Sequence, residues 1–499
     1  MALLMNRLKL RQVVRIPVRH KHGIDHWSRR RKIQTSKDKA LEHFDDFYAS
    51  IYRDSWLDIR TALLNEECKY LAVVNNFSDT ERIRTDLESL GAIHLKGLYD
   101  SQKENRHMFE DRMRAKRRNL SHGKESIEIE TSKDQLSEIQ GVYSEYPNLL
   151  EALKAEDHSV AEKDQRMPIK LESIDENLTE INLDSDRIIG PSVNLSTLQE
   201  YVPTSKIKGV DDWVLESDHY KFYDRAAGFK IEVEKESLLS FPKHLHVYTF
   251  ERGNTTRFPN PKKGSTGVLD YYLFDGGSIL PVLALDIQLG DTVLDMCAAP
   301  GGKSLTILQT LMPRVLVAND LTQSRVKRLQ NVVNEFLSDI YKTENMLLIT
   351  NLDARAIDEK DVYNKILVDV PCTTDRHILH SNDNNIFKPT RLKERLQLPE
   401  VQSDILTNAL KLVKVGGTVV YSTCSLSPIQ NDGVVQVALK RAWEESNSVM
   451  VVKDMTEALL PLRYLYEFGN IDLKYGHIAI PTVDNNWGPM YFCKIVRMQ

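Results

Sequence analysis

From about Thr266 to the C-terminus, short apolar runs alternate with segments of helical periodicity. The runs "TVLDMCA", "VLVAND", "MLLITN", "KILVDV" and "TVVYSTCS" are predicted to be strands, and "PMYFCKIVR" a last strand at the C-terminus. Between the second and third runs, Thr322 is expected to cap a helix. The apolar face of that helix has helical spacing: Val326, Leu329, Val333, Phe336 and Ile340. This alternation predicts an α/β fold with a Rossmann-like parallel sheet and helices on both faces.

Polar residues follow the predicted strands at the point where each strand ends. They are Asp295, Asp320, Asp353, Asp369 with Cys372, and Thr423 with Cys424. Ligands of such sheets bind beyond the carboxyl ends of the strands. Five chain segments therefore converge on one predicted site.

The glycine turn in "LDMCAAPGGKS" follows the first of these strands. A phosphate-binding loop would need a glycine where Cys297 stands, and Pro300 removes a backbone donor, so a triphosphate-hydrolysing enzyme is disfavoured. The dinucleotide pattern GxGxxG is also absent. A turn of small residues with Asp320 at the next strand end suits a nucleoside held through its ribose hydroxyls. S-adenosylmethionine fits this description, because Asp295 or Asp369 would suit its cationic end.

The five cysteines are sparse and odd in number, which favours a reducing compartment over a disulfide framework. Cys68, Cys297 and Cys493 are expected to act as small apolar residues without direct chemistry. Cys372 and Cys424 differ, because each stands at a strand end among polar groups. A thiolate there is a competent nucleophile.

A nucleophile beside a methyl donor suits methylation at carbon 5 of a pyrimidine. That carbon is a poor nucleophile until a thiolate adds to carbon 6 of the ring. An acid near ring nitrogen 3 stabilises the charge that develops, and Asp369 is placed for this role. One cysteine would serve as the nucleophile and the other would assist release of the product.

At these residues the chain resembles the Sun-type (Nol/Nop/Sun) family of RNA cytosine-5 methyltransferases. The resemblance rests on "LDMCAAPGGK", "VDVPCTTD" and "YSTCSLSPIQN", in that order, and covers roughly Phe258 to the C-terminus. It implies an S-adenosylmethionine-dependent methyltransferase sheet. Other segments, such as "VPCTTDRH" and "FDDFYASIY", are most similar to the mitochondrial ribosomal-RNA member of the family.

The family resemblance also implies roles for individual residues. Cys424 would be the nucleophile, Cys372 would assist release, and Lys303 would help Asp369, unless Lys303 is only a solvated lysine of the first helical turn. The residues implied to hold S-adenosylmethionine are Cys297, Ala298, Ala299, Pro300, Gly301, Gly302, Lys303, Asp320, Arg325, Asp353 and Asp369. Phe274-Asp275 stands where the family often has Gln-Asp, so this pair is left without a role.

The N-terminal half differs in composition. Residues 1–32 hold ten Lys/Arg against one acid, interleaved with apolar residues, which is typical of a mitochondrial transit peptide; a basic arm that contacts nucleic acid is the alternative. Residues 103–118 form a basic cluster, either an RNA contact or a solvated helix face. Between Ser121 and Gly190 there are 17 acids against 7 bases, typical of a flexible insert.

The sequence therefore predicts five regions. They are a transit peptide (1–32), a mainly helical region (37–100), a charged flexible insert (101–200), a connecting segment (201–265) and the catalytic domain (266–499).

The net charge of −5 bears on the RNA substrate. A target cytosine must be flipped out of its stack to reach a thiol, and tight RNA binding normally needs a basic surface. We therefore expect weak intrinsic affinity for ribosomal RNA and a partner that binds it. The family resemblance implies a helical-repeat partner of the mitochondrial transcription-termination-factor family, in the mitochondrial matrix. A non-catalytic ribosome-assembly scaffold with the same fold is the alternative function.

Overall fold

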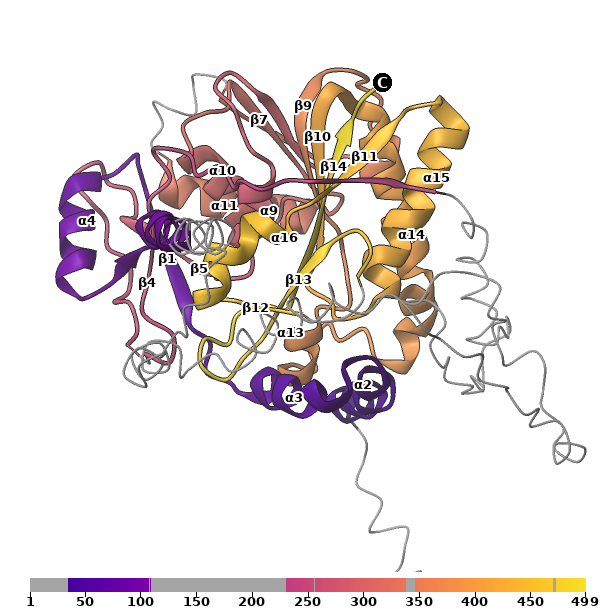
Figure 1. Ribbon diagram of the computed structural model, residues 1–499, viewed down its shortest axis with the longest axis horizontal. Helices are drawn as coiled ribbons and strands as arrows, with labels where there is room; N and C mark the ends of the chain where they lie inside the picture. The colour runs from indigo at the N-terminus through magenta and orange to yellow at the C-terminus, as the bar shows by residue number, and fades with distance from the viewer. Residues whose placement is uncertain (1–34, 107, 109–229, 255, 338–345, 470–472) are drawn as a thin grey trace, which may run out of the picture. The chain divides into compact units, whose positions relative to one another are not determined.

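The computed structural model describes residues 35–106, 108, 230–254, 256–337, 346–469 and 473–499 (Figure 1). The predicted transit peptide, the acidic segment 121–190 and most of the basic cluster 103–118 lie outside the described residues. The described residues of 35–95 and 230–499 belong to one compact unit, and everything below concerns this unit. No helix in that part is long and apolar enough to cross a membrane.

A parallel sheet of five strands forms the centre of this unit. Its spatial order is β8-β7-β6-β9-β10, and all four neighbouring pairs are parallel. The strands are β6 (Thr292–Asp295), β7 (Val315–Asn319), β8 (Leu347–Thr350), β9 (Tyr363–Asp369) and β10 (Val413–Thr423). The sequence correctly predicts all five strands and their alternation with helices.

The order of the strands reverses between β6 and β9. Successive strands run outward from β6 to one side through β7 and β8, while β9 and β10 lie on the other side. Connections therefore leave the sheet in opposite directions between β6 and β9, and sheets of this kind bind their ligands beyond the carboxyl ends of the strands at such a point. The glycine turn follows β6, and Cys372 follows β9 by three residues.

Antiparallel strands extend the sheet beyond β10. The strand β14 (Met490–Arg497) pairs with β10, and β13 (His477–Ile480) and β12 (Glu467–Phe468) follow in order. Off this path, β11 (Met450–Asp454) also pairs with β14, and β3 (Glu232–Lys235) pairs with β11. The predicted C-terminal strand is confirmed, and Cys493 is buried within it, as expected.

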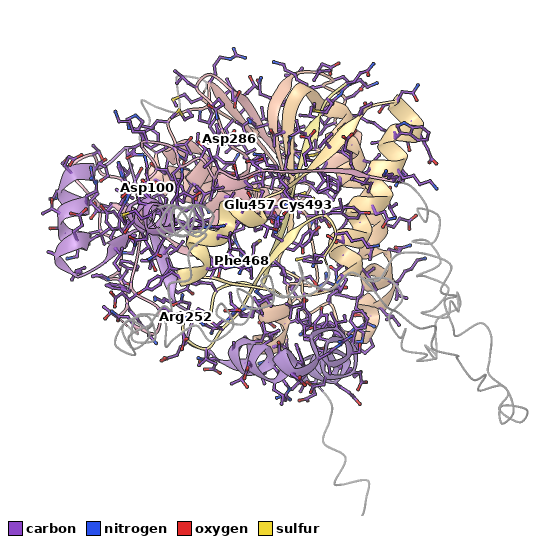
Figure 2. The ribbon with its side chains drawn as sticks, in the orientation of Figure 1. Asp100, Arg252, Asp286, Glu457, Phe468 and Cys493 are labelled. Atoms are coloured by element: carbon purple, nitrogen blue, oxygen red, sulfur yellow. The ribbon has the colours of Figure 1, made fainter. Side chains whose placement is uncertain are left out.

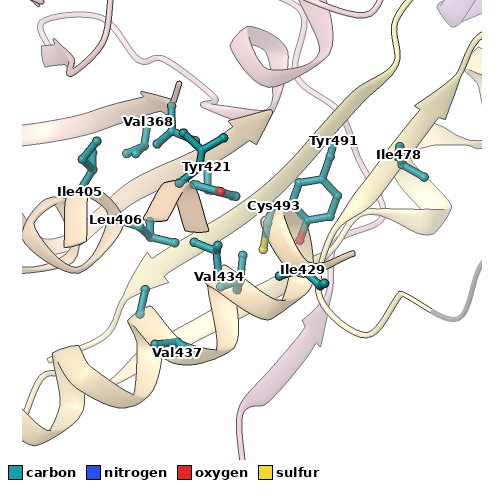
Figure 3. Packing of buried hydrophobic residues seen from close by; sticks show 14 of the residues in the cluster. Val368, Ile405, Leu406, Tyr421, Ile429, Val434, Val437, Ile478, Tyr491 and Cys493 are labelled. Carbon is teal, nitrogen blue, oxygen red and sulfur yellow. The ribbon is translucent and has the colours of Figure 1, made fainter. Parts of the chain in front are cut away.

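Helices cover both faces of the sheet (Figure 1). On one side lie α14 (Leu392–Leu412) and α15 (Val434–Ser446), which pack on each other. On the other side lie α9 (Ile279–Ala284), α10 (Gly302–Gln309) and α11 (Gln323–Phe336). Buried residues of α14 and α15 meet those of the sheet in one apolar cluster, where Leu406 and Val434 lie near Tyr421 (Figure 3).

The helix before β10 differs from its predicted limits. The sequence predicts a helix over 401–413 closed by Gly416-Gly417, but α14 begins at Leu392, continues through Pro399 and ends at Leu412. The glycines lie inside β10, where the pairing with β9 shifts register between Val413 and Thr418. Gly416 has a φ of 78°, which a glycine adopts without the steric cost of a side chain.

The N-terminal region contributes helices and a small sheet. Beside α13 (Asp375–His380) lie α2 (Ser36–Tyr52) and α3 (Trp56–Leu64), and α2 begins with a capping box between Thr35 and Asp38. A separate sheet has the order β2-β4-β1-β5, with all pairs antiparallel. Its strands are β1 (Tyr70–Val74), β2 (Ile93–His94), β4 (Val247–Thr249) and β5 (Tyr271–Asp275), and α4 (Thr80–Ser89) packs against β1.

This small sheet contacts the C-terminal segment of the chain. Arg252, labelled in Figure 2, follows β4 and pairs with Asp484 at 3.0 Å. Lys69 donates to Asn485 Oδ1 at 3.0 Å and lies 5.7 Å from the centre of the Trp487 ring. Segments far apart in sequence thus join around the loop that precedes β14.

Candidate active site

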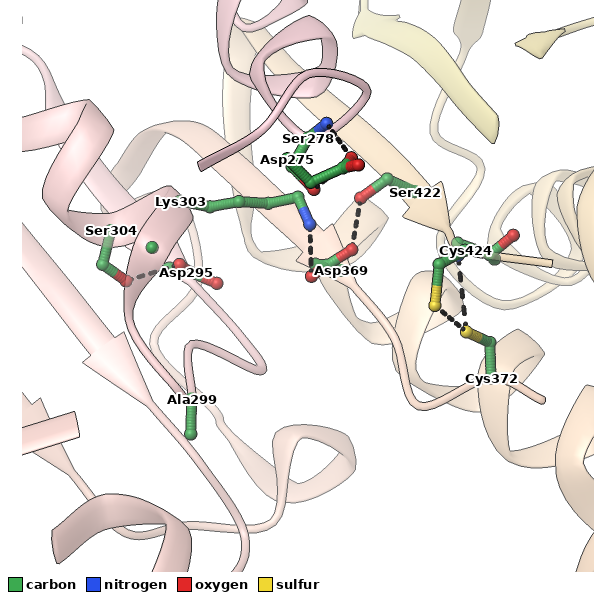
Figure 4. A network of polar contacts seen from close by, with 12 residues as sticks. Asp275, Ser278, Asp295, Ala299, Lys303, Ser304, Asp369, Cys372, Ser422 and Cys424 are labelled. Atoms are coloured by element: carbon green, nitrogen blue, oxygen red, sulfur yellow. Dashed lines mark hydrogen bonds and ion pairs between the residues drawn. The ribbon is translucent and has the colours of Figure 1, made fainter. Parts of the chain in front are cut away.

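The side chains of Cys372 and Cys424 lie together beyond the carboxyl ends of β9 and β10 (Figure 4). Their sulfur atoms are 2.9 Å apart, and the backbone N–H of Cys424 donates to Cys372 Sγ at 3.3 Å. Both cysteines are free thiols and partly exposed. The sequence places them at neighbouring strand ends, and the pairing of β9 with β10 confirms that adjacency.

The close sulfur contact affects how readily Cys424 loses its proton. The hydrogen bond with Cys372 and burial both raise the pKa of Cys424 well above the usual thiol value, while the Lys303 cation acts in the opposite direction. At neutral pH the Cys424 thiol is therefore protonated. It becomes a nucleophile when its proton is removed.

We expect Cys372→Ala to increase the rate at which iodoacetamide alkylates Cys424 near pH 7, because the variant removes the hydrogen bond that holds the proton on Cys424. In the wild-type protein the rate should rise as the pH increases above 9, since only the thiolate reacts. Mass spectrometry of the peptide that contains Cys424 measures both effects. Cys372→Ser is the matched control, because its hydroxyl keeps a hydrogen-bonding group of similar size. Equal rates in all three proteins would contradict the assigned cause.

Lys303 and Asp369 form an ion pair next to the sulfur atoms (Figure 4). Lys303 Nζ lies 2.7 Å from Asp369 Oδ2, and the Ser422 hydroxyl donates to Asp369 Oδ1 at 2.8 Å. Burial lowers the pKa of Lys303, but the Asp369 carboxylate outweighs it, so the pKa is raised. The Lys303 side chain is only 11% exposed, so the alternative of a solvated lysine is wrong. Lys303 is a charged proton donor within reach of Asp369.

The glycine turn is fixed by close packing on both sides. Gly301 has a φ of 117°, and a Cβ there would lie 2.8 Å from Leu329 Cδ1 of α11. A Cβ on Gly302 would lie 2.7 Å from the Phe274 ring. Small residues are therefore required for the helix α10 to begin so near α11 and β5.

The pair Phe274-Asp275, left without a role above, supports the site from outside. Phe274 covers Gly302, as described. Asp275 accepts hydrogen bonds from the backbone N–H groups of Ser278 at 3.1 Å and Gly488 at 3.0 Å. Figure 4 shows Asp275 with its partner Ser278, above the Lys303 side chain in that view.

Asp320 and Arg325 hold the turn from the β7 side. The Asp320 carboxylate accepts from the N–H groups of Ala299 at 3.3 Å and Thr322 at 3.1 Å. Arg325 pairs with Asp320 at 3.3 Å and donates to the Ala299 carbonyl at 2.7 Å. Thr322 precedes α11, but its side chain makes no capping hydrogen bond.

Asp353 lies three residues beyond β8, at the far end of this row of strand ends. Its carboxylate is held by Arg355, whose Nη2 lies 2.7 Å away. The side chain of Asn319 joins the three strand ends, because it donates to the carbonyls of Met296 at 3.1 Å and Leu352 at 2.9 Å. Asn319 is not among the residues predicted above, although it is a polar residue at the end of an apolar run.

Negative charge surrounds the turn. Removal from water raises the pKa of the Cys297 thiol, and three neighbouring carboxylates raise it further. These belong to Asp295, Asp320 and Asp369. Burial raises the pKa of Asp295 itself to about 7, although its hydrogen bond with Ser304, at 2.6 Å, acts against this. This group of carboxylates suits a cationic nucleoside without phosphates, so the residues present fit S-adenosylmethionine.

The structure thus brings the site residues that the sequence predicts together in two groups. Lys303, Asp369, Cys372 and Cys424 meet on the β9–β10 side, and the turn, Asp320, Arg325 and Asp353 lie on the β7–β8 side. Cys68 lies apart from both groups, 3.5 Å from Arg376 Nη1. Ser422 was missed by the sequence analysis, although it directly precedes the Thr423-Cys424 strand end and is the register partner of Asp369.

Comparison with known proteins gives a consistent result. A family model described as 16S rRNA methyltransferase RsmB/F matches residues 282–461. The 5-cytosine rRNA methyltransferase NSUN4 of Bos taurus is 46% identical over 257 residues, which are 51% of this chain and 67% of that protein. Its namesake in Caenorhabditis elegans is 32% identical over 473 residues, covering 94% of this chain and 93% of that protein. The mitochondrial tRNA (cytosine(34)-C(5))-methyltransferase of Danio rerio is 35% identical over 51% of this chain and 68% of that protein.

Proposed function

The chain belongs to the Sun-type (RsmB/F) family of RNA cytosine-5 methyltransferases, and from this membership we propose that it forms 5-methylcytosine in the small-subunit ribosomal RNA of mitochondria. Relatives that match most of the chain are rRNA methyltransferases by name. The basic, apolar N-terminal segment is of the kind that directs proteins to the mitochondrial matrix. One observation carries the chemistry: two sulfur atoms 2.9 Å apart lie beside a Lys303–Asp369 ion pair.

S-adenosylmethionine supplies the methyl group when it is bound along the turn from Cys297 to Lys303, with Asp320, Arg325, Asp353 and Asp369. The residues of the chain then prepare the cytosine. Cys424 gives up its proton to water, and the resulting thiolate sulfur bonds to carbon 6 of the ring. The electron pair of the carbon 5–carbon 6 double bond moves toward nitrogen 3, where the Lys303–Asp369 pair supplies a proton.

Carbon 5 of the adduct is now an enamine-type carbon and accepts the methyl group. Water takes the proton from carbon 5, the proton on nitrogen 3 returns to the Lys303–Asp369 pair, the carbon 5–carbon 6 double bond forms again and the Cys424 sulfur leaves as a thiolate. Cys372, in contact with that sulfur, assists this release. The two thiols therefore have different tasks, one in attachment and one in release.

Bisulfite sequencing of mitochondrial ribosomal RNA tests the proposal. We expect at least one cytosine of the small-subunit RNA to resist conversion when the protein is present and to convert when it is absent. Wild-type protein should restore resistance and Cys424→Ala should not. An unchanged pattern would reject the proposed substrate. Ribosome assembly rescued fully by Cys424→Ala would instead favour the scaffold role.

A partner protein is also part of the proposal. The net charge of −5 is unfavourable for tight binding of RNA by the whole chain. We therefore expect the chain to share RNA binding with a helical-repeat protein of the mitochondrial transcription-termination-factor family. Filter binding of the same ribosomal RNA with and without that protein, at matched salt, measures the gain; equal affinity would contradict it.

Asp320→Ala should weaken binding of S-adenosylmethionine by roughly 10-fold or more, because the carboxylate that would accept the ribose hydroxyls is lost and the support of Ala299 N–H is lost with it. Isothermal titration calorimetry measures the affinity. Asp454→Ala is the matched control, since Asp454 also lies at the end of a strand, β11, and accepts a hydrogen bond from the backbone N–H two residues on, at Thr456, away from the turn. Equal losses in both variants would show a general effect on stability.

A further inference from the structure

A fully buried carboxylate, that of Asp375, joins the two loops that carry the cysteines. The backbone N–H of Leu426 donates to Asp375 Oδ2 at 2.7 Å, and the Ser425 hydroxyl lies 3.3 Å from both carboxylate oxygens. The hydroxyl of Thr373 donates to Asp375 Oδ1. All these donors lie next to the site rather than in it.

The positions of these donors in the chain are the informative feature. Thr373 directly follows Cys372, and Ser425 directly follows Cys424. The two hydroxyl oxygens are themselves 2.9 Å apart. Each cysteine is therefore followed directly by a residue whose side chain contacts the same carboxylate, that of Asp375.

A helix from the other end of the chain supplies the remaining donor. Tyr48 of α2 donates its hydroxyl to Asp375 Oδ2 at 2.8 Å. One turn later, the Tyr52 hydroxyl donates to the Leu426 carbonyl at 2.8 Å. Burial and the Asp375 charge raise the pKa of Tyr48, so it stays a proton donor. The helix α2 thus holds the loop after Cys424 through both tyrosines.

An isolated buried carboxylate is costly unless donors surround it. Among the described residues, no ion pair is formed with Asp375, and its charge is met only by hydroxyl and N–H donors. A hydrophobic residue at position 375 would avoid the free-energy cost of removing a charge from water, so stability alone does not explain the carboxylate. The presence of a carboxylate at position 375 is explained if its hydrogen bonds serve to hold the two cysteine loops in a fixed geometry.

We propose that Asp375 is a positioning residue for methyl transfer, which, together with Tyr48, fixes the Cys372 sulfur against the Cys424 sulfur so that release follows attachment. This inference rests on the proposed function and adds to it a group that touches neither RNA nor methyl donor. It assigns the N-terminal helix α2 a part in the chemistry.

An amide cannot replace this carboxylate, because the surrounding groups are donors. Thr373 Oγ1 already accepts from Gln430 Nε2 at 3.2 Å, and Ser425 Oγ already accepts from the N–H of Ser427 at 3.2 Å. In Asp375→Asn the amide NH₂ would face these two hydroxyls, and one hydroxyl proton would lose its acceptor. The two loops would then separate.

The test compares Asp375→Asn and Tyr48→Phe with the wild-type protein in RNA methylation assays. We expect kcat to fall roughly 10- to 100-fold in Asp375→Asn, with KM for RNA and for S-adenosylmethionine within about two-fold of wild type. The covalent protein–RNA adduct should accumulate, because Cys372 is displaced from the sulfur that must leave. Tyr48→Phe removes one of the four donor groups around Asp375. It should also lower kcat and increase the adduct, but less than Asp375→Asn does.

Asp432→Asn is the matched control, because Asp432 is another fully buried carboxylate. It accepts from the N–H groups of Lys474 at 2.6 Å and Gly476 at 3.1 Å and from Tyr491 at 2.6 Å, and neither cysteine loop contacts it through these bonds. Thermal unfolding should show losses of stability in both Asp→Asn variants, but only Asp375→Asn should change kcat and the adduct.

Normal kcat and a wild-type adduct level in Asp375→Asn would overturn the inference, as would equal changes in Asp432→Asn. If Asp375→Asn does not fold, Tyr48→Phe decides, and unaltered turnover in that variant overturns the inference. Failure of the wild-type protein itself to form any adduct would reject the proposed function instead.

Discussion

Cys424→Ala is expected to reduce transfer of a methyl group to RNA by roughly three orders of magnitude or more, because carbon 5 of cytosine is not nucleophilic until a thiolate has added to carbon 6. Cys372 Sγ lies 2.9 Å from Cys424 Sγ, but in the proposed mechanism it serves release of the product, so it does not replace the lost nucleophile. Transfer of a tritium-labelled methyl group from S-adenosylmethionine to mitochondrial ribosomal RNA measures the loss.

The affinity for S-adenosylmethionine should change little in this variant, since Cys424 lies on the β9–β10 side of the site and the turn after β6 is untouched. Cys493→Ala is the control, because Cys493 is buried in β14 and its sulfur lies 3.6 Å from the Tyr475 carbonyl. If Cys424→Ala methylates normally and Cys372→Ala is inactive, the two roles are exchanged. If both variants methylate normally, the thiol mechanism is wrong.

The parallel sheet and the adjacency of the two cysteines could be predicted from the sequence, and for the same reason. Apolar runs that end in polar residues mark buried strands, and the carboxyl ends of parallel strands meet at one edge. Asp369 and Ser422 are register partners at that edge. The strand ends predicted from the sequence therefore locate the Asp369 side of the Lys303–Asp369 pair to within a few residues.

The contribution of α2 could not be predicted in this way. Tyr48 and Asp375 are 327 residues apart, and no local pattern connects them. The periodicity of α2 predicts only an apolar face, which includes Phe44, Phe47 and Ile51. Tertiary packing decides which surface this apolar face covers. It also decides which group the Tyr48 hydroxyl binds.

The limits of α14 were missed because two local signals gave misleading information. Pro399 is unfavourable inside a helix, and Gly416-Gly417 is typical of a helix end. In the structure Pro399 is buried within α14 among residues such as Leu398 and Gln402, and the glycines serve a change of register in β10. Tertiary packing outweighs local propensity at both positions.

Cys372→Ala is expected to keep the first half of the reaction and to lose the second. Cys424 and the Lys303–Asp369 pair remain in place, so addition to carbon 6 and methylation of carbon 5 proceed. Release fails, because the thiol in contact with the departing sulfur is gone. The variant should therefore accumulate a covalent complex with RNA, visible as a labelled band that persists in denaturing gels, while multiple turnover falls by roughly two orders of magnitude or more.

The double variant Cys372→Ala/Cys424→Ala separates this adduct from non-specific cross-linking, since it should form no band. Iodoacetamide labelling provides a second check, because Cys424 in the trapped complex should be protected from alkylation and the free variant should not. A Cys372→Ala protein that turns over at the wild-type rate without an adduct would remove Cys372 from the release step. The 2.9 Å contact between the sulfurs would then serve only to raise the pKa of Cys424.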